Sequence, residues 1–259
     1  MAITTTDPKS EIKRLSEALA KVGVTLPEAV TTAPERVRVE APTSREIGEA
    51  IRAAKDPLTD KRVAQLMLAH QIAKGGFESD VMQAGWADQR QALKDVRADL
   101  NDALHAVFDA AARELEAVAP ELKGYPDLDS LVLASLPARV ADPARRAVDA
   151  QHTLRAAHSA WLTLWRSVGG QRSGRPEEDI LAVCQPSPAE WLEHASRRPQ
   201  SLPAPGDVWT MARHGWTLSL AHDIRAAKAR AEHIRTTIDR DREKRRLEKG
   251  RATSWGLYR

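Results

Sequence analysis

Side chains that could bind a metal ion are few in this chain and lie far apart. The chain has one cysteine, Cys184, and eight histidines. A zinc ion needs three or four such ligands around it, and neither C-x-x-C nor H-x-x-x-H occurs. The closest histidine pairs are His152 with His158 and His214 with His222, at spacings that do not bring two side chains to one point of a helix. We therefore expect no metal ligands and no metal cofactor.

Motifs for phosphate binding and for nucleophilic catalysis are missing from the sequence as well. Neither G-x-x-x-x-G-K-[ST] nor G-x-G-x-x-G occurs, and there is no G-x-S-x-G. Cys184 follows an apolar run, in which a thiol packs as a small hydrophobic residue. The acidic pair Glu177–Glu178 suits the start of a helix. We assign no catalytic residue and no cofactor, and an all-α enzyme without a linear motif is the third alternative for the function.

Charge is distributed unevenly along the chain. Lys and Arg number 39 against 36 Asp and Glu, which gives a net charge of +3. Residues 197–259 carry a net charge of +8, whereas the remainder carries −5. The basic residues that we consider for contact with nucleic acid or with an acidic surface all lie beyond Ile238, and they are Arg240, Arg242, Lys244, Arg245, Arg246, Lys249 and Arg251.

Acidic residues are interleaved with these basic ones. They are Asp239, Asp241, Glu243 and Glu248, and pairs such as Asp241 with Arg245 have the i,i+4 spacing of helical ion pairs. A helix that binds phosphates gains affinity by neutralising their charge, so interleaved acids weaken that interpretation. Three interpretations stay open for this arm: a solvated helix of mixed charge, contact with nucleic acid, and contact with an acidic protein surface.

An apolar cluster follows the charged arm. Trp255, Leu257 and Tyr258 come after Gly250, which we expect to end the helix. Exposed apolar clusters of this kind usually dock on a surface. We expect these three residues to dock either on the protein's own helices or on another subunit.

Composition predicts an all-α fold. Aromatic residues make up 4% of the 259 residues, and seven of the eleven are tryptophan. Alanine, the strongest helix former, is abundant, whereas β-branched residues are too scattered for a sheet. Hydrophobic residues make up 42% of the chain, and no run of about 20 apolar residues could span a bilayer, so we expect no membrane contact.

The compartment can also be predicted from the sequence. Met1–Pro8 lacks the basic and apolar pattern of a secretory signal, and a lone cysteine suits a reducing compartment. The excess of arginine and alanine suggests a bacterium of high GC content or one of its bacteriophages. We expect the protein in the cytoplasm, or in a virion if the chain is of phage origin.

Apolar residues at spacings of three and four predict three long helices, over 87–118, 143–168 and 207 to about 248. The second begins at Asp142-Pro143 and has the heptad spacing of a coiled coil. Four tryptophans lie on these stripes and are predicted to be core residues: Trp161, Trp165, Trp209 and Trp216. We expect an elongated antiparallel helical bundle or coiled coil of three long helices, with several short helices.

Short helices and a linker are predicted before residue 86. Thr43 and Glu46 have the spacing of a capping box, as Ser187 and Glu190 do later in the chain, and Asp60 can cap a further helix. Residues 77–84 are expected to add one or two turns before Gly85. The predicted regions are 1–85 with short helices and a linker, 86–238 with the long-helix bundle, and 239–259 with the charged arm and its apolar tip.

These patterns favour two functions. The first is a non-enzymatic helical interaction or assembly protein, such as a structural component of a phage or mobile element, with a protein partner or self-association. The alternative is a nucleic-acid-binding protein that uses the basic residues 240–251.

Overall fold

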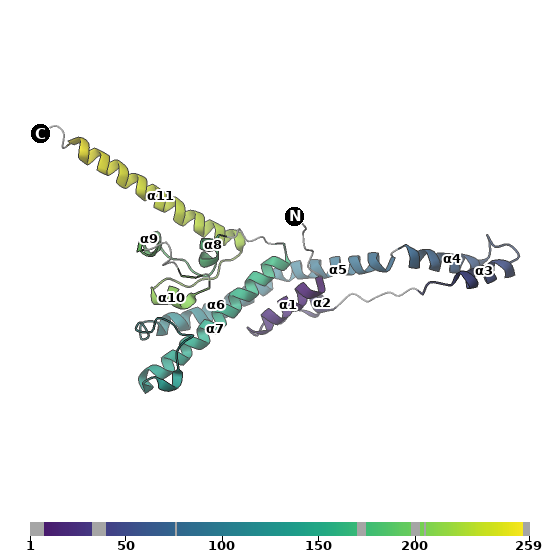
Figure 1. Ribbon diagram of the computed structural model, residues 1–259, viewed down its shortest axis with the longest axis horizontal. Coiled ribbons are helices and arrows are strands. Elements are labelled where there is room, and N and C mark those ends of the chain that lie inside the picture. Colours follow the sequence, from purple (N-terminus) through teal and green to yellow (C-terminus); the bar gives the residue numbers. More distant parts are fainter. Residues whose placement is uncertain are drawn as a thin grey trace. The chain divides into compact units, whose positions relative to one another are not determined.

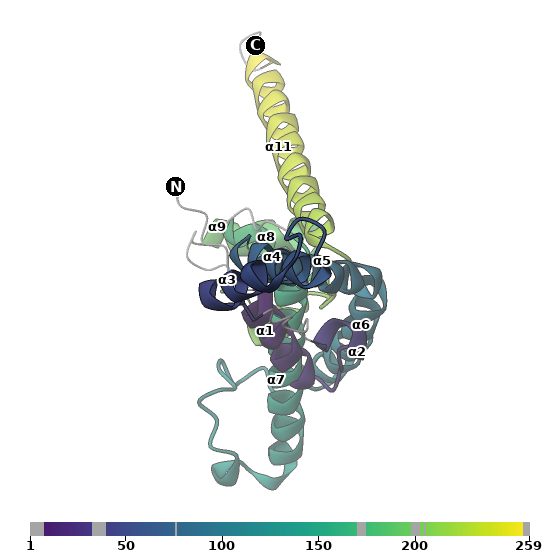
Figure 2. The same ribbon diagram turned by 90° about the vertical axis from the view of Figure 1, so that its right-hand side faces the viewer.

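The computed structural model describes residues 8–32, 40–75, 77–169, 175–197, 203–204 and 206–255 (Figures 1 and 2). This part of the chain is helical, and its only β contact is an isolated bridge between Cys184 and Leu218. The all-α prediction is confirmed. The elements are α1 (Pro8–Ala20), α2 (Glu28–Thr31), α3 (Ser44–Ala53), α4 (Lys61–Lys74), α5 (Phe77–Asp95), α6 (Arg97–Val118), η1 (Leu133–Ser135), α7 (Ala138–Ser167), α8 (Pro176–Leu181), α9 (Pro188–Arg197), α10 (Val208–Arg213) and α11 (Ile224–Trp255).

The chain divides into two compact units. The first comprises Met1–Ile12 and Leu26–Val96, and the second comprises Lys13–Thr25 and Arg97–Arg259. No described helix of either unit is both long and apolar enough to cross a membrane. The three regions expected from the sequence stay a prediction.

In the first unit, local signals set the starts of α3 and α4. The backbone N–H of Glu46 donates to Thr43 Oγ1 at 3.2 Å, and the N–H of Thr43 donates to Glu46 Oε2 at 2.7 Å. This is the predicted capping box, and its hydrogen bonds lower the pKa of the Glu46 carboxyl. Asp60 caps α4 by accepting from the N–H groups of Arg62 and Val63.

Helix α5 is longer than the sequence indicated. The prediction of one or two turns ending at Gly85 is wrong, because α5 continues through that residue to Asp95. A glycine inside a helix costs only about 1 kcal/mol relative to alanine, which packing can offset. Gln89 contributes here: its buried side chain donates to the carbonyls of Val30 at 2.5 Å and Thr32 at 3.2 Å, tying α5 to α2. The helix predicted over 87–118 is therefore two helices, α5 and α6.

The core of the second unit is the antiparallel pair α6 and α7, which lie side by side in Figure 1. Arg97 at the start of α6 contacts Trp165 at the end of α7, and Glu114 near the end of α6 pairs with Arg146 near the start of α7. The predicted apolar stripes face each other, and their small alanines allow close approach. Phe108 is buried at the turn where the stripe was predicted to place Val107, which is only half-buried. The buried residues of the predicted stripes are Leu100, Leu104, Ala111, Leu115, Val118, Ala147, Ala150, Leu154, Ala157, Trp161 and Leu164.

The start of α7 differs from the prediction. The helix begins at Ala138, not at Asp142-Pro143, and Pro143 lies inside its second turn. Near a helix start, a missing N–H is tolerated better than in the interior. At the other end the predicted stop is confirmed, because Gly169 has a φ of +87°.

The prediction of one continuous helix over 207–248 is wrong for residues 207–223. Helix α10 ends at Arg213, Gly215 has a φ of +79°, and residues 216–222 are non-helical before α11 begins. From Trp216 to Leu220 buried side chains alternate, since Trp216, Leu218 and Leu220 are buried at a spacing of two, and Ala221 is buried as well.

Helix α11 packs on α8 and α9, and α10 packs on α6 and α7. The three-helix bundle is thus not confirmed. The helix α9 begins with the capping box predicted from Ser187 and Glu190. Of the four tryptophans predicted to be core residues, Trp161, Trp209 and Trp216 are buried, whereas Trp165 is half-buried.

Candidate functional site

The predicted basic arm is the second half of α11. Helix α11 runs to Trp255, so Gly250 does not end it. Its last buried residue among those described is Ile238, and beyond this point it extends past α8 and α9 (Figure 1). Arg240, Arg242, Lys244 and Arg246 are exposed, and Arg245, Lys249 and Arg251 continue the same helix.

The charges of this arm are partly separated onto different faces. Arg242 pairs with Asp239 at 3.7 Å, and Arg246 pairs with Glu243 at 3.5 Å, both at i,i+3. Arg240 and Lys244 are one turn apart and therefore share a face, and neither forms an ion pair with a described side chain. The sequence showed acids interleaved with the basic residues, and in the structure no described carboxylate pairs with Arg240 or Lys244.

The apolar tip of the chain is only partly described. Trp255 is the last residue of α11, whereas Leu257 and Tyr258 lie outside the described residues. Their docking stays a prediction. On the arm itself, Leu247 is 57% exposed.

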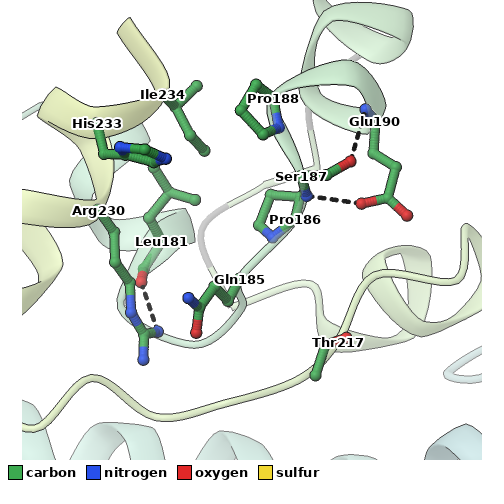
Figure 3. A pocket seen from close by; sticks show the side chains of 10 residues that line it. All are labelled: Leu181, Gln185, Pro186, Ser187, Pro188, Glu190, Thr217, Arg230, His233 and Ile234. Atoms are coloured by element: carbon green, nitrogen blue, oxygen red, sulfur yellow. Dashed lines mark hydrogen bonds between the residues drawn. The ribbon is translucent and has the colours of Figure 1, made fainter. Parts of the chain in front are cut away.

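The first half of α11 borders a pocket of about 460 Å³, shown in Figure 3. Leu181, Pro186, Pro188 and Ile234 form apolar walls, and the polar side chains of Gln185, Thr217, Arg230 and His233 lie around them. The lining also includes Ser187 and Glu190. Glu190 accepts a hydrogen bond from the Ser187 N–H and lies on the opposite side of the pocket from His233 (Figure 3).

Arg230 is the central polar residue of this region. Its guanidinium donates to the carbonyl oxygens of Leu181 at 3.1 Å, Cys184 at 3.3 Å, Ser219 at 2.8 Å and Leu220 at 3.3 Å. It also donates to Ser219 Oγ at 3.2 Å. Burial lowers the pKa of Arg230. Because these bonds use its donors, Arg230 holds two loops together and shapes the pocket wall.

Cys184 is not a nucleophile in this fold. It is buried, and its Sγ donates to the carbonyl of Ile180 at 3.2 Å. Burial raises the pKa of the Cys184 thiol to about 12, so the thiolate is not populated near neutral pH. The interpretation of this residue as a small buried hydrophobic side chain is confirmed.

A second groove, of about 600 Å³, lies between α11 and the helices α8 and α9. Its apolar lining consists of Leu181, Trp191, Leu192, Ala231, Ile234 and Ile238, and its charged lining consists of Arg175, Glu177, Arg235, Asp239 and Arg242. Trp191 stacks on Trp216 with ring centroids 5.8 Å apart, which fixes this wall. The groove is therefore of mixed character, and the sequence did not reveal it because it is assembled from three separate helices.

In the first unit, the hairpin of α3 and α4 exposes apolar side chains. Leu58 is 96% exposed, Leu68 58%, Met67 41% and Ile51 41%. Among the described side chains of α3 and α4, only Ala50 and Val63 are buried. The sequence contained a signal for this exposure, because Leu68 lies outside the series Val63, Leu66, Met67 and Ile72 that predicts a helix here.

Two histidines of the second unit lie close together. The ring centroids of His105 in α6 and His222 are 6.2 Å apart. His105 Nε2 is buried and has no hydrogen-bond partner among the described residues. Burial lowers the pKa of His105, although Asp109 acts in the opposite direction. Among the described residues, no three His, Cys, Asp or Glu side chains are grouped as metal ligands would be.

Comparison of the chain with protein-family models, with curated proteins and with solved structures found no match. Its function must therefore be argued from the surfaces described above.

Proposed function

We propose that this protein is a helical interaction and assembly protein, which binds a protein partner or a second copy of itself through exposed helix surfaces. The observation that carries the proposal is the apolar surface of the α3–α4 hairpin, with Leu58, Leu68, Met67 and Ile51 exposed. Clusters of large exposed apolar side chains are typical of interaction sites, since leaving them in water is unfavourable.

The arrangement of residues in α4 supports a contact with another helix. Val63 is buried, and Met67 lies one turn further along that side of the helix. Ala64, Leu68 and Ile72 repeat at i,i+4 on another side, where Leu68 is mostly exposed. A helix with apolar residues on two sides can pack on two neighbours, and α3 covers one. This contact between helices would be made in an assembly such as a phage or mobile-element structure.

Site-specific photo-crosslinking tests this function. A photo-crosslinking residue is substituted for Leu68 in the full chain and activated in cells of the native host. Val132 is the matched control, because it is 65% exposed and lies in the second unit, outside the hairpin. The proposal expects a defined crosslinked product, either a dimer or a complex with another protein, from position 68 and not from position 132. Equal or absent crosslinking at the two positions would reject it.

A second candidate function is nucleic-acid binding by the arm. It is favoured by Arg240 and Lys244, which share a face and form no ion pair with any carboxylate that the structure describes. Against it, Arg242 and Arg246 are partly neutralised by Asp239 and Glu243. Phosphate contacts make affinity depend on salt, with a slope that reflects the number of contacts.

Fluorescence anisotropy with a labelled DNA duplex at several salt concentrations tests this second function. The double variant Arg240→Gln/Lys244→Gln should reduce the slope of log affinity against log salt by about two. The control is Arg242→Gln/Arg246→Gln, which removes the same charge from residues that already have acidic partners. Binding without salt dependence, or equal slopes for both double variants, would exclude the arm as a nucleic-acid site.

A further inference from the structure

A third pocket lies at the first turn of α11, where it meets the start of α6 and the end of α7. Its volume is about 460 Å³, which is within the range of about 300–1,000 Å³ that is typical of small-molecule sites. The lining includes three cations, Arg97, Arg225 and Lys228, together with the side chains of Trp165 and Asp223.

The positive charge in this pocket is not neutralised within the described structure. None of the three cations forms an ion pair with a described carboxylate. The single acidic residue of the lining, Asp223, caps α11 by accepting from the backbone N–H of Ala226 at 2.6 Å. Its carboxylate therefore already has a structural role. The lining keeps a net positive charge, and the first turn of α11 adds a field that favours an anion.

Trp165 gives the pocket an aromatic wall. The Arg97 guanidinium lies over its ring, 5.1 Å from the centroid. The ring of Trp161 packs against it in an edge contact at 6.3 Å. Trp165 Nε1 is buried and has no hydrogen-bond partner among the described residues.

We propose that this pocket binds a small organic phosphate of about the size of a nucleotide. Arg225 and Lys228 hold the phosphate group, because cations form strong charge-assisted hydrogen bonds with its oxygens. The organic part of the ligand lies against the Trp165 side chain, which lines the pocket together with Arg97. The site lies in the second unit and goes beyond the proposed partner binding, which depends on the α3–α4 hairpin in the first.

Isothermal titration of the full chain with ADP, inorganic pyrophosphate and adenosine tests the site. ADP and pyrophosphate should bind, and adenosine should bind at least tenfold more weakly than ADP, since it lacks the phosphates. The double variant Arg225→Gln/Lys228→Gln should weaken ADP binding by about tenfold or more. The matched control is Arg235→Gln, on the same helix and outside this pocket, which should change the affinity less than twofold.

Both replaced side chains are exposed, so the double variant should fold, and circular dichroism checks this. The single variant Lys228→Gln provides a second test, because it should weaken ADP binding less than the double variant does. The proposal is overturned if neither ADP nor pyrophosphate binds at millimolar concentration, or if the double variant binds ADP as the wild type does. A single-stranded DNA of about 20 nucleotides is titrated in parallel; binding of that strand without binding of ADP would assign the phosphate to nucleic acid and also reject the proposal.

Discussion

Glu116 in α6 accepts a hydrogen bond from the backbone N–H of Leu218, with Oε1 and N 2.7 Å apart. The two residues are 102 positions apart in the chain. Leu218 also forms the isolated bridge with Cys184. The Glu116 side chain therefore fixes the non-helical segment 216–222, which leads into α11 and the pockets around it.

Glu116→Ala should destabilise the second unit. It leaves the partly buried N–H of Leu218 without a partner, which costs about 1–3 kcal/mol. Urea unfolding followed by tryptophan fluorescence measures this change, because Trp216 is buried in the same segment. Glu121→Ala removes an exposed carboxylate at the end of α6 and should change the free energy of unfolding by less than about 0.5 kcal/mol. Equal effects of the two substitutions would contradict the anchoring role of Glu116.

The segment before α11 also shows what the sequence could not decide. Trp216, Leu220 and Ile224 are spaced by four and fit a helix, whereas Trp216, Leu218 and Leu220 are spaced by two and fit an extended segment. The backbone partners of the extended form come from a distant loop: Ser219 donates to Val183, Ala221 donates to Ala182, and Thr217 accepts from Gln185. Pattern alone contains no information on such partners.

Local features were predicted more accurately than distant ones. The capping boxes of α3 and α9 and the stop at Gly169 depend on residues within one turn, so spacing was sufficient. The stripes of α6 and α7 were correct at most positions, although Phe108 and not Val107 is buried in α6. The pockets around α11 were not predicted, because their lining residues come from several helices and loops.

Gly215→Ala tests the break between α10 and α11. Gly215 has a φ of +79°, and no atom lies within 4 Å of the position that a Cβ would take. The substitution should therefore destabilise by backbone strain alone, by roughly 1–2 kcal/mol. Gly124→Ala is the control, since that position also has open space but no positive φ. A thermal unfolding midpoint that falls no further for Gly215→Ala than for the control would show that the left-handed turn is not required.

Arg230→Lys tests the link between the two loops of the second unit. A lysine keeps the charge but cannot reach four carbonyls in a fork geometry. Several buried carbonyl oxygens would lose their donor, so the variant should be destabilised by about 2 kcal/mol or more. Arg235→Lys, whose partner is the exposed Glu232, should change stability by less than about 0.5 kcal/mol. If Arg230→Lys unfolds in urea with the same free energy as the wild type, the two loops do not depend on these hydrogen bonds.

The stability of the second unit should depend on pH through His105. Burial is the main cause of its lowered pKa; Asp109 opposes this, His222 adds to it, and Ala221 and Asp102 oppose it more weakly. The folded state then binds fewer protons than the unfolded state at pH values below about 6.5, the ordinary pKa of histidine. Stability from the neutral His105 is therefore fully present above that pH, and it is lost as the pH falls toward the folded pKa.

His105→Gln should remove this dependence, because glutamine does not titrate. Urea unfolding at several pH values between 5 and 7.5 measures the free energy of unfolding. In the wild type this free energy should decrease as the pH is lowered, and in this variant it should decrease less. The exposed His152→Gln is the matched control in the neighbouring α7 and should keep the wild-type slope. His222→Gln removes the neighbouring ring and should make His105 easier to protonate, so its slope should be shallower than that of the wild type. If His105→Gln and the wild type lose stability equally on acidification, another group must carry the effect.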